Sequence, residues 1–155
     1  TCMYELPLLP RTEAHSSTPP EPPRVDPLLR GPGWQLFVDA AAWRVRVAPQ
    51  LVNPAASYAD IRRRLGQLSA RLGPRPLLLD LRAAPRLDGP GPRELLARLL
   101  REFEQRGLPI IVVVGHQSVQ AVRVHSLILQ TAPSWGRCVT HPADATRWLV
   151  GVQTD

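Results

Sequence analysis

The sequence contains no lysine and only two cysteines. All nineteen basic residues are arginine, and alanine, proline, glycine and leucine are abundant. This combination indicates GC-rich codon usage and a bacterial source rather than a surface selected for arginine. Because Cys2 and Cys138 are too few for a disulfide framework, a reducing compartment is favoured. We therefore expect a cytoplasmic bacterial protein.

Long hydrophobic runs are also missing. No apolar run approaches the roughly 18–20 residues that a membrane-spanning helix needs. The N-terminus lacks the charged-then-apolar pattern of a signal peptide. The sequence therefore predicts no membrane span.

Negative charge is in the minority, and the net charge is +6. Such a balance permits attraction to nucleic acid or to anionic membranes. However, the arginines are scattered along the chain, and the densest run, Arg62–Arg64, falls on a predicted helix, where consecutive side chains fan out around the axis. A solvated helix face is the favoured interpretation, and nucleic-acid binding is not expected.

Proline, in contrast, is frequent and unevenly placed. Residues 1–32 carry eight of the eighteen prolines, which predicts a flexible N-terminal tail of polyproline II character. Two short apolar groups, MYELPLL and VDPLL, interrupt this tail. Each is a candidate docking motif that orders on a partner. For VDPLL the alternative is that it packs on the domain as its first turn.

The rest of the chain alternates between strand-like and helix-like patterns. We predict one domain over residues 33–151 and a short C-terminal tail over residues 152–155. The order β-β-α-β-α-β-α-β-α predicts an α/β fold with a mixed, mostly parallel sheet of about five strands and about four helices. The predicted strands are 34–39, 42–48, 75–81, 108–115 and 137–141, and the predicted helices are 57–73, 93–107, 118–132 and 142–151.

One stretch, LLLDLRAAPRLDGPGPRELLARLL, places two carboxylates between a strand and a helix. Asp80 ends the predicted strand and Asp88 lies in the loop. Gly91 allows close approach of backbone to a ligand, the helix N-terminus offers unpaired N–H groups, and Arg93 adds a cation. The stretch therefore has two interpretations, an anion-binding loop or a helix that Asp88 caps, and capping is favoured.

The same stretch resembles the STAS domain of sulfate transporters and anti-sigma factor antagonists. DLRAAPRLDGPGPRELL aligns without a gap on the family's D-L-S-x-V-x-x-I-D-S-S-G-L-x-x-L-L pattern. GLPIIVVVG resembles the family's next strand, and DATRWL resembles the E-A-x-x-W-L ending of a STAS/SEC14-like branch. The resemblance spans about residues 33–151 and implies a domain that binds another protein through its loop, here Asp80, Asp88, Gly89, Pro90, Gly91 and Arg93.

The sequence departs from that family at the two serines of the D-S-S-G motif. Anti-sigma factor antagonists accept a phosphate on the second serine, which disrupts docking of the partner kinase. Gly89 and Pro90 occupy these positions here. Because Pro90 has no hydroxyl group, the phosphorylation switch cannot operate at this position.

Catalytic and metal-binding patterns are missing as well. The histidines form no ligand-spaced pair, and no zinc motif, nucleophile elbow, P-loop or dinucleotide fingerprint occurs. His116 and His141 end predicted parallel strands and are expected at one edge of the sheet. Ser118 is better explained as a helix N-cap than as a nucleophile. We predict no catalytic residues, no metal and no cofactor.

We therefore predict a non-enzymatic regulatory or scaffolding domain whose partner is another protein, for instance a kinase-like or other signalling protein. The alternative is a small carrier that holds an apolar ligand between helices and sheet. A cavity lined by Ile128 and Leu129 would distinguish the two.

Overall fold

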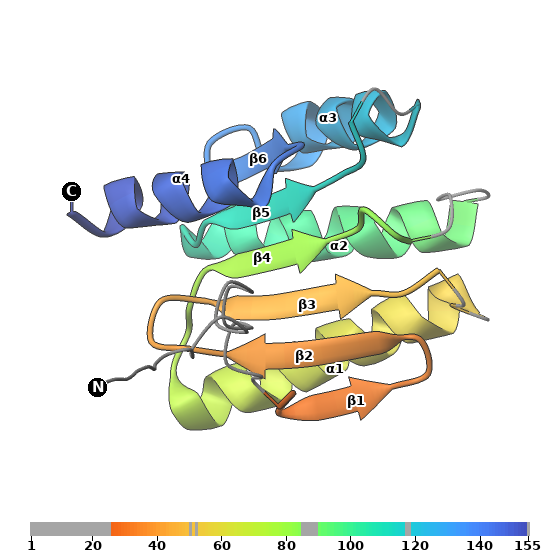
Figure 1. Cartoon of the computed structure of the whole chain (residues 1–155), viewed down its shortest axis with the longest axis horizontal. Helices are drawn as coiled ribbons and strands as arrows, with labels where there is room; N and C mark the ends of the chain where they lie inside the picture. Colours follow the sequence, from red (N-terminus) through yellow and green to blue (C-terminus); the bar gives the residue numbers. More distant parts are fainter. Residues whose placement is uncertain (1–25, 50, 52, 85–89, 117–118, 155) are drawn as a thin grey trace, which may run out of the picture.

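Six strands of the computed structural model form one sheet, and they follow one another across it in chain order (Figure 1). The structure describes residues 26–49, 51, 53–84, 90–116 and 119–154. With its four helices the chain has the predicted α/β fold. The elements are β1 (Leu29–Gly31), β2 (Trp34–Val38), β3 (Trp43–Val47), α1 (Pro54–Leu72), β4 (Leu77–Asp80), α2 (Pro90–Arg106), β5 (Ile110–Val113), α3 (Val119–Thr131), β6 (Gly136–Val139) and α4 (Pro142–Thr154).

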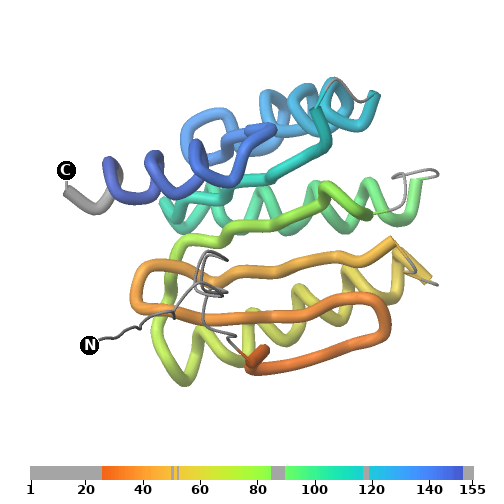
Figure 2. Tube along the Cα trace, viewed as in Figure 1, coloured from red at the N-terminus to blue at the C-terminus, as the bar shows by residue number. Residues whose placement is uncertain are grey.

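The sheet is mixed and mostly parallel, as predicted. Strands β1, β2 and β3 form an antiparallel meander, and β3, β4, β5 and β6 are parallel to one another. Parallel neighbours need a crossover, which α1, α2 and α3 supply in turn. The Cα trace in Figure 2 shows the chain advancing across the sheet in one direction from β1 to β6.

The prediction of about five strands missed β1, which lies inside the segment predicted to be a tail. Leu29 packs against the core, and β1 pairs with β2 across a tight turn at Pro32 and Gly33. Gly33 has a φ of 81°, which glycine adopts without strain. The GPG sequence is therefore a hairpin turn rather than the end of a tail. Leu29, the last residue of VDPLL, therefore packs on the domain, which is one of the two interpretations of that segment. Residues 1–25 lie outside the described residues.

The predicted start of α1 at Ser57 was wrong by three residues. The helix begins at Pro54, and the side chain of Asn53 accepts a hydrogen bond from the Ala56 N–H at 3.2 Å. An asparagine cap followed by proline at the first helical position is a strong start signal. Ser57 is instead buried inside the helix. The predicted stop at Gly73 is confirmed, with a φ of 93°.

Helices α2 and α4 are also longer than predicted. Helix α2 begins at Pro90 instead of Arg93, because proline is tolerated in a first helical turn. Helix α4 continues past Gly151 to Thr154, so the predicted C-terminal tail is largely helical. A single glycine costs a helix about 1 kcal/mol but does not end it.

The two faces of the sheet are covered unequally. Residues at alternate positions of the strands pack with α1, α2 and α3 in the main core, which includes Leu77, Leu79 and Leu81. On the other face, Leu78 and Ile111 pack with α4, which lies mainly over β5 and β6. In Figure 1, α4 lies in front of the sheet and the other helices lie behind it.

In the described part of the chain, no helix covers the α4 side of β1, β2, β3 and the end of β4. We call this region the open face. None of the described helices is long and apolar enough to cross a membrane.

Candidate binding surface on the open face of the sheet

The structure separates the residues that the sequence groups around the loop before α2. Asp80 is the last residue of β4. Its neighbours Leu79 and Leu81 lie in the core with α2, so Asp80 points to the opposite face of the sheet. Asp88 and Gly89 lie outside the described residues. Asp80 is therefore not part of a site at the α2 N-terminus.

Pro90, Gly91 and Arg93 lie in the exposed or half-exposed first turn of α2. A Cβ added at Gly91 would meet only the Cβ of Ala55, at an ordinary contact distance of 3.5 Å. The surroundings described here therefore do not require a glycine. A role for this loop in binding a partner or an anion stays a prediction.

The two strand-end histidines do come together. His116 follows β5 and His141 follows β6, and their ring centroids are 6.0 Å apart. Their expected placement at one sheet edge is thus confirmed. Among the described residues, however, no group of three histidine, cysteine or carboxylate side chains is placed to hold a metal. Ser118 lies outside the described residues.

Side chains of a different kind gather on the open face, in two rows across the strands. Strand register places Arg30 opposite Gln35, Gln35 opposite Arg46, and Arg46 opposite Asp80. Two residues further along the strands, the register places Phe37, Arg44 and Leu78 side by side. Because alternate residues of a strand share a face, both rows project from the same side of the sheet.

These rows line a groove of about 830 Å³. Arg82, which follows β4, also lines it, and Asp26, Pro27 and Pro142 contribute to its wall. The groove therefore combines four arginines, three aspartates and an apolar strip. The sheet brings together arginines from three separate parts of the sequence, with Arg44 and Arg46 on one strand.

Two of the arginines are held by aspartates. The Nε of Arg44 lies 2.8 Å from a carboxylate oxygen of Asp39, and the Nη2 of Arg82 lies 2.8 Å from one of Asp80. The Nε of Arg82 donates to the other Asp80 oxygen at 3.0 Å. These bonds fix Arg44 and Arg82 in place and satisfy their charges.

Arg30 and Arg46 form no ion pair with a carboxylate of the described residues. The guanidinium carbon of Arg46 lies 5.7 Å from the centre of the Phe37 ring, a cation–π arrangement. Both arginines are exposed. Among the described residues, these two arginines are the cations of the groove that have no ion-paired carboxylate.

The neighbouring arginines lower the pKa values of Asp39 and Asp80 and keep both groups ionised. Burial of Asp80 acts to raise its pKa, but hydrogen bonds from the side chain and backbone of Arg82, together with the charges of Arg82 and Arg46, outweigh burial and lower the pKa. For Asp39, burial is likewise outweighed by the Arg44 side chain and by the N–H groups of Ala41 and Ala42, so its pKa is also lowered. Both groups therefore stay charged at neutral pH.

The ion pair between Asp80 and Arg82 predicts that Asp80→Asn lowers the free energy of unfolding, by an amount that depends on pH. A carboxylate whose pKa is lower in the folded state stabilises the fold above its unfolded-state pKa of about 3.9, and the stabilisation disappears as the pH falls through the folded-state pKa. Urea unfolding at about pH 6 should show the variant destabilised by up to ~1 kcal/mol, and at about pH 2 the difference should vanish. An equal difference at both pH values would contradict the ion pair.

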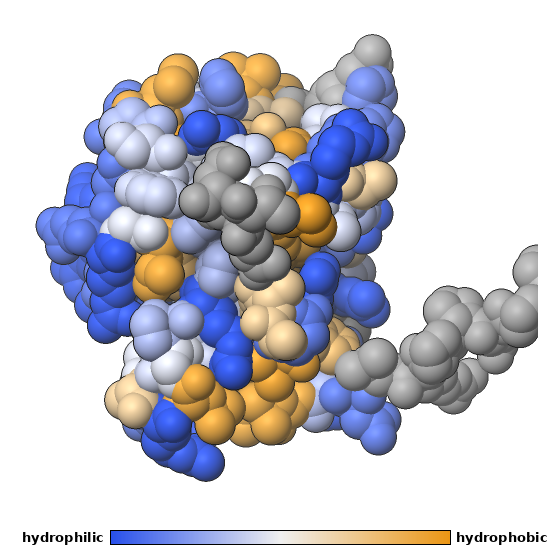
Figure 3. All heavy atoms as spheres, turned by 90° about the vertical axis from the view of Figure 1, so that its left-hand side faces the viewer, coloured by the Kyte–Doolittle hydropathy of each residue, from blue (hydrophilic) through white to orange (hydrophobic). Residues whose placement is uncertain are grey.

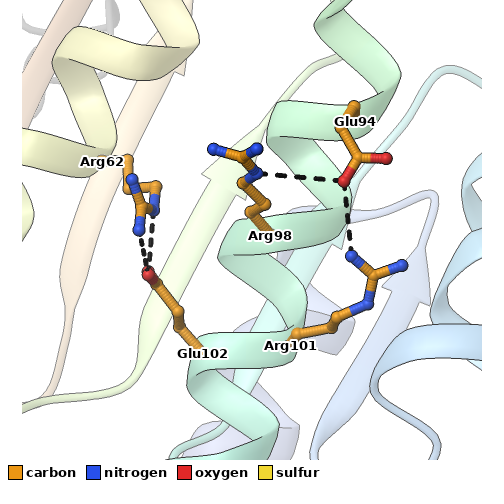
Figure 4. Close-up of polar contacts among 5 residues, drawn as sticks. All are labelled: Arg62, Glu94, Arg98, Arg101 and Glu102. Carbon is orange, nitrogen blue, oxygen red and sulfur yellow. Dashed lines mark hydrogen bonds and ion pairs between the residues drawn. The ribbon is translucent and has the colours of Figure 1, made fainter. Parts of the chain in front are cut away.

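On the outer surface of α1 and α2, in contrast, arginines are paired with glutamates (Figure 4). Arg62 of α1 is paired with Glu102 of α2, and the Nε–Oε2 distance is 2.9 Å. Glu94 lies within 3.9 Å of Arg98 and within 3.5 Å of Arg101. The arginines drawn there have glutamate partners, as expected for the solvated helix face that the sequence predicts.

Figure 3 shows the left-hand side of Figure 1, turned by 90° toward the viewer. Apolar residues on this side form separate patches between hydrophilic ones (Figure 3). In this view the surface is mixed in character.

Sequence reasoning treated the arginines as scattered and missed this grouping. One signal was present, because Arg44 and Arg46 alternate with Trp43, Val45 and Val47. That alternation places both arginines on the side of the strand away from the core. Arg30 and Arg82 carried no comparable signal, because Arg30 lies in the segment predicted to be a tail and Arg82 follows a strand end.

No protein-family model and no curated protein sequence matches this chain. The resemblance to the STAS family therefore rests on the sequence motifs alone and stays a prediction.

Proposed function

We propose that this protein is a non-enzymatic regulatory or scaffolding domain that binds another protein through the open face of its sheet. The observation that carries the proposal is the pair Arg30 and Arg46, which are exposed and form no ion pair with a described carboxylate. Arginine and aromatic side chains, here Arg46 and Phe37, are enriched in protein interfaces.

The resemblance to the STAS family supports the same class of function. Members of that family act by docking to other proteins, and a cytoplasmic bacterial signalling partner is part of this proposal. Gly89 and Pro90 stand where the family has serines. Phosphorylation at these two positions therefore does not control partner binding.

The carrier alternative gains no specific support. Ile128 is buried in the core, whereas Leu129 is 61% exposed. The two residues therefore do not line a common cavity, which was the expected mark of an apolar ligand site.

Charge reversal on the open face tests the proposal. The full chain carrying an affinity tag is expressed in its own source and purified gently, as the natural sequence, as Arg46→Glu and as the matched control Arg98→Glu. Arg98 is exposed on α2, so the control has the same change in net charge at a distant surface. A partner protein should co-purify with the natural chain and with the control, and its recovery should fall about tenfold or more with Arg46→Glu, because a like charge at an interface costs several kcal/mol.

Equal recovery of the same partner with all three chains would contradict the open face as the binding surface. Circular dichroism of each purified chain shows whether the variants are folded. If Arg46→Glu is unfolded, the milder Arg46→Gln replaces it in the same comparison.

A further inference from the structure

We propose that the open face recognises an extended acidic segment of the partner protein, with one carboxylate held between Arg30 and Arg46 and a nearby apolar side chain on Phe37. This inference rests on the proposed function and names the chemistry of the partner. It follows from the spacing of the two rows of side chains.

The first row supplies the carboxylate site. Arg30 and Arg46 lie on either side of Gln35 in register, so their backbones are about 10 Å apart, twice the spacing between neighbouring strands. Two long guanidinium side chains converge easily on one anion placed above Gln35. Arginine binds carboxylates through two parallel hydrogen bonds, and the Gln35 amide adds a further donor.

The second row supplies the apolar contact. Phe37 is half-buried, and its neighbour in register, Arg44, is held by Asp39. This row is two residues along the strands from the first, about 6.6 Å. Because side chains two residues apart in an extended peptide have the same spacing, a glutamate and an apolar residue two positions apart match both rows.

The aspartates define what kind of anion fits. Asp80 ends the first row and Asp39 lies beside the second, so four arginines in the groove face three aspartates. A nucleic acid brings a charge at every nucleotide and needs several unpaired cations along its path. A segment with isolated carboxylates among apolar residues avoids the aspartates and uses Arg30 and Arg46 alone.

A synthetic peptide tests this inference directly. The probe has eight residues, with glutamate and leucine alternating at every second position and serine between them, and both ends are blocked. The matched control peptide has glutamine in place of glutamate. Binding to the ¹⁵N-labelled full chain is followed by NMR shifts of the backbone N–H groups of β1, β2 and β3.

The glutamate peptide should shift these signals, and the glutamine peptide should bind about tenfold more weakly or worse, because hydrogen bonds between charged groups are lost. Arg46→Gln and Arg30→Gln should each weaken binding of the glutamate peptide by a similar factor, and Arg98→Gln should leave it unchanged. Raising the salt concentration should weaken binding as well.

Three outcomes would overturn the inference. The first is no binding of the glutamate peptide at millimolar concentration, or equal binding of the glutamine peptide. The second is that inorganic phosphate shifts the same signals with equal affinity, which would indicate a site for free anions. The third is tighter binding of a short oligothymidylate at the same signals. If partner recovery still depends on Arg46 in any of these cases, the proposed function stands and only the acidic segment is refuted.

Discussion

Replacing Leu79 with alanine should lower the free energy of unfolding by about 3 kcal/mol. Leu79 is fully buried in the central strand β4, and its neighbours in register are Val45 of β3 and Val112 of β5. Its side chain points into the core shared with α1 and α2. The loss combines the transfer energy of the removed carbon atoms with the cavity that a rigid sheet cannot close.

The same substitution at Leu129 is the matched control. Leu129 is 61% exposed on α3, so Leu129→Ala should change the free energy of unfolding by no more than about 0.5 kcal/mol. Urea unfolding of the three proteins, followed by circular dichroism, measures both effects. Similar losses at the two positions would contradict the placement of β4 at the centre of the sheet.

Replacing Gly136 with alanine should destabilise the protein by about 2 kcal/mol, the typical cost of overpacking. A Cβ at this position would lie 2.7 Å from the carbonyl oxygen of Ala132 and 2.9 Å from Cγ2 of Ile128. The Gly136 N–H also donates to that same carbonyl at 2.9 Å. Since one of the crowded atoms belongs to the backbone, the end of α3 or the start of β6 must move.

Gly66 provides a control position, at which alanine is expected to stabilise the protein. Gly66 lies in the exposed middle of α1, and an added Cβ would have no neighbour within 4 Å. Gly66→Ala should therefore raise the free energy of unfolding by about 0.5–1 kcal/mol. Thermal and urea unfolding of both variants measure the two changes in the free energy of unfolding. A stabilising Gly136→Ala would show that α3 and β6 do not approach closely.

Much of the fold follows from local signals. The apolar runs LLLD and IIVV indicate buried strands, and helical spacing identifies α1 and α2. The predicted strands 34–39 and 42–48 are confirmed as β2 and β3, which pair antiparallel. Strand β1 was missed because it is only three residues long and follows a proline-rich segment, where composition outweighs a weak alternating pattern.

The layering of the helices has a topological cause. Successive parallel strands advance across the sheet in one direction, and crossover connections are right-handed. Helices α1, α2 and α3 must therefore lie on the same face. Helix α4 follows the last strand and is free of that rule, so it packs on the other face, over β5 and β6.

The candidate site was less predictable than the fold, because it depends on the order of the strands in the sheet. Sequence motifs drew attention to Asp80 as a neighbour of the α2 N-terminus, although the alternation in LLLDL places it on the other face. The groove depends on strand order, which brings Arg30, Arg46 and Asp80 into one row from distant parts of the sequence. The local alternation of residues indicates the side of the sheet on which Arg46 and Asp80 lie, and only the pairing of strands shows which residues are their neighbours.

Site-specific photocrosslinking in the protein's own source tests the central claim most directly. A photoreactive phenylalanine derivative replaces Phe37 on the open face, Arg93 on the predicted loop, or the exposed Gln105 on α2. If the open face binds the partner, we expect a crosslink to a partner protein from position 37, and a crosslinked peptide that contains aspartate or glutamate. A crosslink to the partner from position 93 or 105, with none from position 37, would contradict it.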